Sequence, residues 1–282
     1  GVKDILCLLV EKRKTKRFIA DKTDHNGRTP LHVAAYNARA WILQWLIENG
    51  ANVDACDETG LTPLHYASEY GRLEHAQKLL AAGANVNSVC EAGQTAVHKA
   101  CLKGHLRMLR LLVAHGAIVH GNIDSAMSSP LYGAVMFGHV SIIHELLTVH
   151  GVDANEFVEG RRSPLHVACT SGNLDAVKTL LRGGANPNLP VVAMPLSSVI
   201  CFSSSHDIAE TLLLYGANVY QQNEEDHYVN GNTGTTVLRY AEDADDGYMF
   251  SEDDTFVESM IRRVTSFVRQ PNDPNERIFW FA

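Results

Sequence analysis

Thr62-Pro63-Leu64-His65-Tyr66-Ala67-Ser68-Glu69-Tyr70-Gly71 is the stretch of sequence that decides the fold. Its first four residues return, with conservative changes, at intervals of 33 or 34 residues. The other copies begin at Thr29, Thr95, Ser129 and Ser163. A second marker, a Gly-Ala pair such as Gly83-Ala84, keeps the same period. Two markers with one period indicate an internal repeat, and a period of this length is typical of stacked arrays.

Residues 62–94 show how one unit is expected to fold. Thr62 is placed to cap a helix that has Pro63 at its first position, where the missing N–H is not needed. Gly71 is expected to end this helix after about two turns. A longer second helix follows and ends at Gly83, and its apolar residues have helical spacing. They are Leu73, Ala76, Leu79 and Leu80.

This unit resembles the ankyrin repeat. The resemblance lies in the Thr-Pro-Leu-His turn, the glycine after the first helix, the Leu-Leu pair and the Gly-Ala-Asn-Val-Asn run at 83–87, and it covers about residues 1–220. It implies an all-α fold, an ankyrin-repeat solenoid of stacked helix-turn-helix units joined by β-hairpin fingers. Helices this short cannot bury their apolar faces alone, so stacking of neighbouring units builds the core.

We expect three segments along the chain. Residues 1–20 form a partial N-terminal repeat with a basic run at 12–17, and residues 21–222 hold about six ankyrin repeats. Residues 223–282 form a degenerate seventh repeat with a long finger, an acidic loop and a C-terminal capping helix. Because the sequence opens inside an amphipathic helical pattern, we expect the chain to be part of a longer protein.

Composition argues against several classes of function. The chain has 24 basic and 32 acidic residues, a net charge of -8, so it has no overall field that would gather nucleic acid or anionic lipid. Apolar runs are too short for membrane insertion, and the start lacks a signal-peptide pattern. We therefore expect a cytoplasmic protein, with the nucleus as the alternative. The six cysteines form no CxxC pair and are expected to be reduced thiols.

Motifs for chemistry are lacking in the sequence. No nucleotide-binding, hydrolase or metalloprotease motif occurs, so we predict a non-enzyme with no catalytic residue, no metal and no cofactor. The run Ser205-His206-Asp207 has the residue types of a triad, but we interpret it as a helix start, because triads are defined by geometry. Histidines such as His32 and His65 recur one repeat apart, which favours a structural use. The acidic loop does not fit the EF-hand pattern.

The resemblance implies that a partner protein contacts the finger tips and the exposed ends of the first helices. These helix ends are unusually apolar here, and exposed apolar side chains mark binding sites, although some could instead turn inward to fill the stack. The predicted contacts at helix ends are Tyr36, Asn37, Glu69, Tyr70, Leu102, Lys103, Met136, Phe137 and Phe202, with Tyr70, Met136 and Phe137 at the centre. Those at the fingers are Arg28, Glu58, Leu61, Phe157 and Arg161.

Two other functions remain open. The repeats look like those of ankyrin proteins with a SOCS box, which implies a substrate-recognition subunit of a ubiquitin ligase with ligase subunits as partners. No cysteine follows Cys201, so this hypothesis needs the Leu-Cys-Arg core of the box to lie outside this chain. Alternatively, the repeats present a substrate to a catalytic domain outside the chain. The resemblance also implies asparaginyl hydroxylation, at Asp54, Asn87 and Asn188.

Overall fold

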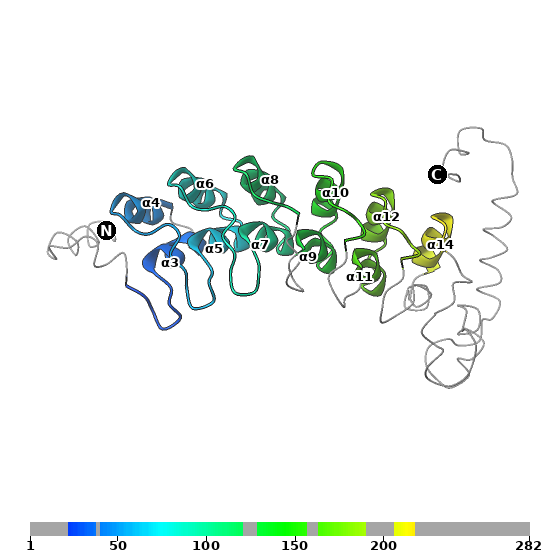
Figure 1. Ribbon diagram of the computed structural model, residues 1–282, viewed down its shortest axis with the longest axis horizontal. Coiled ribbons are helices and arrows are strands. Elements are labelled where there is room, and N and C mark those ends of the chain that lie inside the picture. The colour runs from blue at the N-terminus through cyan, green and yellow to red at the C-terminus, as the bar shows by residue number, and fades with distance from the viewer. Residues whose placement is uncertain (1–21, 38–39, 121–128, 157–162, 190–205, 218–282) are drawn as a thin grey trace, which may run out of the picture.

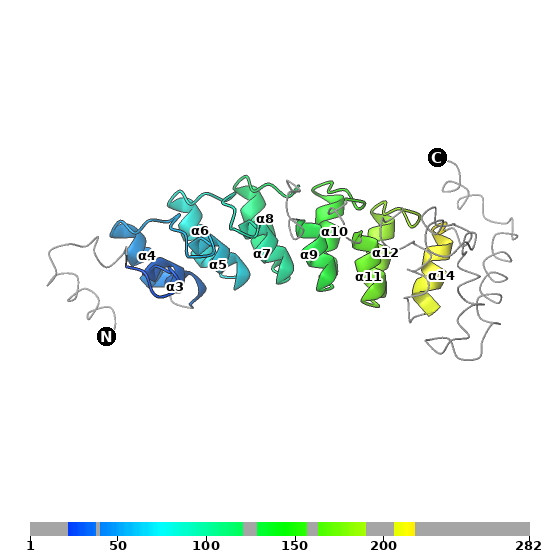
Figure 2. The same ribbon diagram turned by 60° about the horizontal axis from the view of Figure 1, so that its bottom comes forward.

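The computed structural model describes residues 22–37, 40–120, 129–156, 163–189 and 206–217. Its helices stand in two rows, with α3 and α14 at opposite ends, and loops project from the side of the first row (Figure 1). The first row holds α3 Pro30–Tyr36, α5 Pro63–Glu69, α7 Ala96–Leu102, α9 Pro130–Met136 and α11 Pro164–Thr170. The second row holds α4 Ala40–Glu48, α6 Leu73–Ala81, α8 Leu106–Ala114, α10 Val140–Thr148, α12 Leu174–Arg182 and α14 His206–Leu214. Turned by 60°, the two helices of each repeat still lie side by side (Figure 2).

The helix boundaries predicted for residues 62–94 are confirmed. Thr62 has an extended backbone, α5 starts at Pro63, and Gly71 reverses the chain with φ 64° before α6 starts at Leu73. The same device ends the first helix of the next repeat at Gly104, where φ is 79°. Both values lie in the left-handed region that favours glycine.

One continuous apolar core runs through the repeats, and each repeat contributes the same positions to it. The second residue of every first helix is at most 1% exposed: Leu31, Leu64, Val97, Leu131 and Leu165. The fifth residue is a buried alanine, which lets neighbouring first helices approach closely: Ala34, Ala67, Ala100, Ala134 and Ala168. Complete burial of a side chain the size of leucine stabilises the fold by about 1.5–3 kcal/mol, so stacking provides what short helices lack.

The fingers hold their shape through carboxylate side chains. Asp57 accepts hydrogen bonds from the backbone N–H groups of Thr59 at 2.8 Å and Leu61 at 3.0 Å. Adjacent tips are joined by backbone bonds, because Glu58 N–H donates to the carbonyl of Asn26 at 3.1 Å. In the described part of the chain these fingers contain turns and no β-strand.

Several predicted segments lie outside the described residues. They are the partial repeat at 1–20, the long finger, the acidic loop and the capping helix at 223–282. Within the described ranges, no helix has the length and apolar character needed to cross a membrane.

Candidate protein-binding surface

Three tyrosines from the first two repeats form a cluster: Tyr36 ends α3, Tyr66 lies in the middle of α5, and Tyr70 directly follows α5. The ring of Tyr36 lies 5.4 Å from that of Tyr70 and 5.9 Å from that of Tyr66, measured between centroids, in tilted arrangements. Tyr70 is 51% exposed, whereas Tyr36 and Tyr66 are half-buried. Tilted aromatic pairs of this kind stabilise one another, so Tyr70 presents its ring to solvent from a fixed base.

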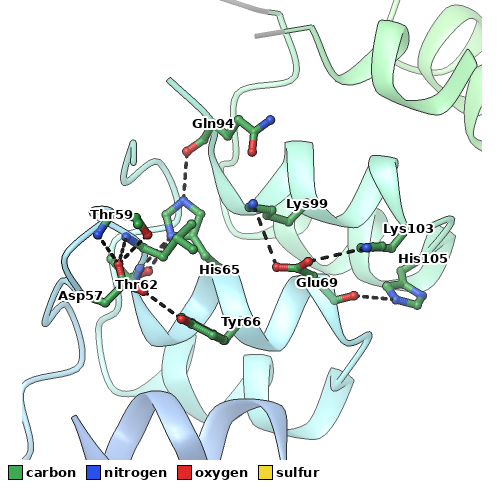
Figure 3. Close-up of polar contacts among 11 residues, drawn as sticks. Asp57, Thr59, Thr62, His65, Tyr66, Glu69, Gln94, Lys99, Lys103 and His105 are labelled. Atoms are coloured by element: carbon green, nitrogen blue, oxygen red, sulfur yellow. Dashed lines mark hydrogen bonds and ion pairs between the residues drawn. The ribbon is translucent and has the colours of Figure 1, made fainter. Parts of the chain in front are cut away.

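Tyr66 fixes this cluster to the finger of its own repeat. Its hydroxyl donates to Oδ2 of Asp57 at 2.8 Å, and its ring meets His32 edge-on at 5.6 Å (Figure 3). Burial and the Asp57 carboxylate raise the pKa of Tyr66, so the phenol stays protonated. The sequence analysis did not select Tyr66. Its spacing of four residues from Tyr70 places both side chains on one face of the helix and would have indicated it.

Glu69 places a negative charge beside the tyrosine cluster, and two lysines of the next repeat lie close to it. Its carboxylate lies 3.6 Å from Nζ of Lys103 and 4.0 Å from Nζ of Lys99 (Figure 3). The carbonyl of Glu69 accepts a hydrogen bond from Nε2 of His105 at 3.1 Å. Glu69 is therefore held by contacts within the array, and Lys103 remains exposed beside it.

Two large apolar side chains extend the exposed surface into the fourth repeat. Met136 is 37% exposed and Phe137 is 57% exposed, both at the end of α9. The Phe137 ring stacks on that of His139 with centroids 6.4 Å apart, and His139 in turn donates to the carbonyl of Leu102 at 3.1 Å. We call the exposed side chains of Tyr70, Lys103, Met136 and Phe137, together with the half-buried Tyr36 and Tyr66, the first-helix surface.

Not every predicted contact lies in the open. Leu102 is half-buried and lies against Gly133 of the next repeat, where an added Cβ atom would be 3.4 Å from the leucine Cδ1. Asn37 is exposed, and its side-chain amide bonds the carbonyl of Val33 at 2.7 Å. Phe157, Arg161 and Phe202 lie outside the described residues.

The finger residues predicted as contacts differ in their surroundings. Nε of Arg28 donates to Oδ2 of Asp24 at 2.9 Å, and this bond lowers the pKa of Asp24 to about 2. Glu58 is exposed at its tip. Leu61 is half-buried, and its carbonyl accepts a hydrogen bond from Nε2 of His32 at 2.9 Å. Arg28 and Leu61 thus have structural contacts of their own.

Histidines at the start of the first helices link consecutive repeats, as their spacing predicted. Nδ1 of His65 accepts from the N–H of Thr62 at 3.1 Å, so the ring proton is on Nε2, which donates to the carbonyl of Gln94 at 3.0 Å (Figure 3). Burial lowers the pKa of His65 to about 4. His65 is therefore a neutral structural link across most of the pH range.

The predicted hydroxylation positions also bridge repeats. Asp54 accepts from the N–H of Asn85 at 2.9 Å. Asn87 donates to the carbonyl of Gly116 at 3.1 Å and accepts from Ile118 N–H at 2.9 Å. Asn188 donates to the carbonyl of Gly216 at 2.8 Å.

Asn155 occupies the same place in the fifth repeat and was missed. Its side chain donates to the carbonyl of Gly184 at 3.0 Å and accepts from the N–H of Asn186 at 2.7 Å. The period of the repeat was the signal that could have identified it.

Groups suited to catalysis or metal binding do not come together in the described ranges. No three His, Cys, Asp or Glu side chains there could hold one metal ion. The thiol of Cys169 is buried and free, and burial raises its pKa to about 12. His206 and Asp207 lie in the first turn of α14, and the carbonyl of Asp207 accepts a bond from the Thr211 hydroxyl at 2.6 Å.

Comparison with known proteins identifies relatives of this chain. A family model described as ankyrin repeats in three copies matches residues 1–90, 78–157 and 120–191. Ankyrin repeat and SOCS box protein 11 of Mus musculus is 34% identical over 100 residues, which is 35% of this chain and 30% of the mouse protein. Alpha-latrocrustotoxin-Lt1a of Latrodectus tredecimguttatus is 36% identical over 59 residues, 21% of this chain and 4% of the toxin. The chain therefore spans less than a third of either relative.

A solved ankyrin-repeat structure also matches most of the chain. The crystal structure of the human ASB11 ankyrin repeat domain matches with a TM-score of 0.69 and 28% identity. The match covers 84% of this chain and 98% of that domain. Ankyrin repeats are a protein-interaction fold without catalytic machinery of their own. From its repeated sequence, its stacked helix pairs and these matches, the chain belongs to the ankyrin-repeat family.

Proposed function

We propose that this chain binds another protein through the first-helix surface. The observation that carries the proposal is the row of exposed aromatic and apolar side chains, Tyr70 at 51%, Met136 at 37% and Phe137 at 57% exposure, at equivalent ends of two first helices. Aromatic residues and methionine are enriched in protein interfaces, and tyrosine is among the residues that contribute most of the binding energy. Their common position at the ends of first helices makes them the candidate interface.

Other exposed apolar residues provide a matched control. Val89 is 61% exposed, Ile118 59% and Val149 64%, and all three lie in loops away from the ends of the first helices. Truncating them removes exposed apolar side chains from another part of the molecule. It leaves the first-helix surface intact.

The test is affinity purification from the protein's own cells, followed by mass spectrometry. The variant Tyr70→Ala, Met136→Ala, Phe137→Ala is compared with wild type and with Val89→Ala, Ile118→Ala, Val149→Ala. We expect a partner that co-purifies with wild type and the control and is lost from the first variant. Equal recovery from all three proteins would refute the proposal. Fractionating the cells beforehand tests the cytoplasmic or nuclear location that we also propose.

A second function is favoured by the similarity to ankyrin repeat and SOCS box protein 11. We propose as the alternative that the full-length protein is a substrate-recognition subunit of a ubiquitin ligase. The first-helix surface would then bind the protein to be ubiquitinated, and a SOCS box would lie elsewhere in the protein. Cullin and elongin subunits among the co-purifying proteins would support this assignment, and their absence from full-length purifications would argue against it.

A further inference from the structure

The residue that directly follows a first helix occupies an equivalent place in three consecutive repeats. Tyr70 follows α5, Lys103 follows α7 and Phe137 follows α9. Their backbone angles are nearly the same, with φ between -101° and -94° and ψ between 0° and 6°. Because α5, α7 and α9 are neighbours in the first row (Figure 1), a lysine stands between two exposed aromatic residues along the array.

The charges near this lysine leave a local excess of positive charge. Apart from histidines, the charged residues within the helices α3, α5, α7, α9 and α11 are Glu69 and Lys99. The carboxylate of Glu69 lies 4.0 Å from Nζ of Lys99 and 3.6 Å from Nζ of Lys103 (Figure 3). Two ammonium groups thus face one carboxylate, so one positive charge is in excess. The whole chain has a net charge of -8, which makes this part of the first-helix surface different from the rest of the protein.

Lys103 is the member of this group that a partner can reach. Its side chain is 47% exposed, compared with 15% for Lys99 and 27% for Glu69. An ion pair this open to water contributes little to stability. Lys103 can therefore turn toward a carboxylate that a partner supplies, while Lys99 stays beside Glu69.

Acidic groups near α5 gather at its other end. Asp57 lies in the finger that precedes α5, whereas Lys103 lies near the opposite end of the helix (Figure 3). The exposed acids Glu58 and Glu91 also belong to finger tips. A partner that meets both ends of the first helices therefore encounters negative charge at the fingers and positive charge at Lys103.

We propose that the partner places a carboxylate side chain against Lys103 and apolar side chains against Tyr70 and Phe137. This inference rests on the proposed function, because it specifies the partner segment that the first-helix surface binds. Neighbouring first helices are about 8–10 Å apart, a distance that an extended chain covers in about three residues. We therefore expect an extended segment with an acidic residue and an apolar residue about three positions to either side of it.

Both the rings and the charges favour this kind of segment. The ring of Tyr70 is held by that of Tyr36, and the ring of Phe137 by that of His139, so a partner does not have to order them on binding. A basic residue at the central position would be repelled by Lys103. Complementary charge of this kind contributes mainly to the choice of partner, because a like charge in the same place weakens binding strongly.

The test is selection of peptides from a random library displayed on phage, with the whole chain as the bait. We expect wild type to enrich Asp or Glu with apolar residues on both sides, and Lys103→Glu to enrich Lys or Arg at that position instead. Arg107→Glu makes the same change of charge at an exposed residue of α8, in the second row of the same repeat, and should select the same peptides as wild type. An acidic peptide selected by wild type should bind Lys103→Glu about tenfold more weakly in a fluorescence anisotropy titration. It should bind Glu69→Gln more tightly, because Lys103 then has no carboxylate within the array to leave.

The outcomes distinguish this inference from the proposed function. Peptides that need Tyr70 and Phe137 but show no acidic preference, or bind Lys103→Glu as well as wild type, overturn the inference and leave the proposed function in place. Peptides whose binding survives Tyr70→Ala, Met136→Ala, Phe137→Ala count against both. Selection of no peptide by wild type also overturns the inference, because it requires a linear segment. If Lys103→Glu folds poorly beside Glu69, Lys103→Gln replaces it and is expected to lose the acidic preference.

Discussion

Nε2 of His65 donates a hydrogen bond to the carbonyl oxygen of Gln94 at 3.0 Å, and thereby ties the start of α5 to the finger of the next repeat. The same ring accepts from the N–H of Thr62 through Nδ1. The bond from Thr62 needs the neutral imidazole, because a protonated ring has no acceptor. The stability of the array is therefore coupled to pH through this residue.

We predict that acid destabilises the protein partly through His65. Its pKa falls from 6.5 when unfolded to about 4 when folded, so its contribution is present above pH 6.5 and is lost as the pH falls toward 4. The lost contribution amounts to about 3 kcal/mol of unfolding free energy. Urea unfolding measured at several pH values in this range gives the free energy of unfolding as a function of pH. We expect this free energy to fall less steeply with falling pH in His65→Gln than in wild type. The exposed His25→Gln is the control, and an unchanged slope in His65→Gln would contradict the prediction.

We predict that His75→Met stabilises the protein. His75 is 4% exposed, its Nε2 has no hydrogen-bond partner, and it occupies a core position where α8 has Met108 and α10 has Ile142. A buried polar group without a partner costs about 1–3 kcal/mol, and methionine removes that cost. Thermal or urea unfolding should show the gain. The reciprocal Met108→His should lose a similar amount, and a destabilised His75→Met would show that the imidazole is needed there.

We predict that Gly104→Ala is more destabilising than Gly116→Ala. Both glycines have positive φ, 79° and 85°, so each alanine carries the conformational cost of about 1–2 kcal/mol. Only at Gly104 would the new Cβ atom meet a ring, that of His139 at 2.7 Å, whereas nothing lies within 4 Å at Gly116. Displacing His139 breaks its bond to Leu102, which adds about 1 kcal/mol. Equal losses would mean that the His139 contact contributes nothing.

We predict that protein from its own cells carries an added oxygen atom on the bridging Asn and Asp residues. Asn87 and Asn155 are the strongest candidates, since each side chain makes two bonds to the next repeat. Tandem mass spectrometry would locate the oxygen, and Asn85, which lies in the same loop, is the internal control. Unmodified peptides from cells with active hydroxylase would contradict this prediction.

Local sequence signals predicted most of the fold, and specific residues explain why. Thr62, Pro63 and Gly71 determine where a helix starts and ends through their own backbone chemistry, and the structure has those boundaries. The burial of Leu64 follows from helical spacing. Helix boundaries and buried positions of this kind depend on residues close in sequence, so they recur in every repeat that has the same residues.

The candidate binding surface was harder to predict because it depends on contacts between repeats. Leu102 is half-buried because Gly133 leaves room for it, and Tyr36 is half-buried because Tyr66 and Tyr70 lie against it. Glu156 contacts Ser129, although it does not occupy the position of any histidine link. None of these relations can be derived from one repeat considered alone.

The most direct test of the proposed function is site-specific photo-crosslinking in the protein's own cells. A photoreactive phenylalanine analogue is placed at position 70 and, in a separate protein, at position 149, which is exposed but away from the first-helix surface. Our account predicts that one partner protein is captured from position 70 and not from position 149. Capture from position 149 alone, or no specific capture from position 70 in cells where the protein co-purifies with a partner, would contradict it.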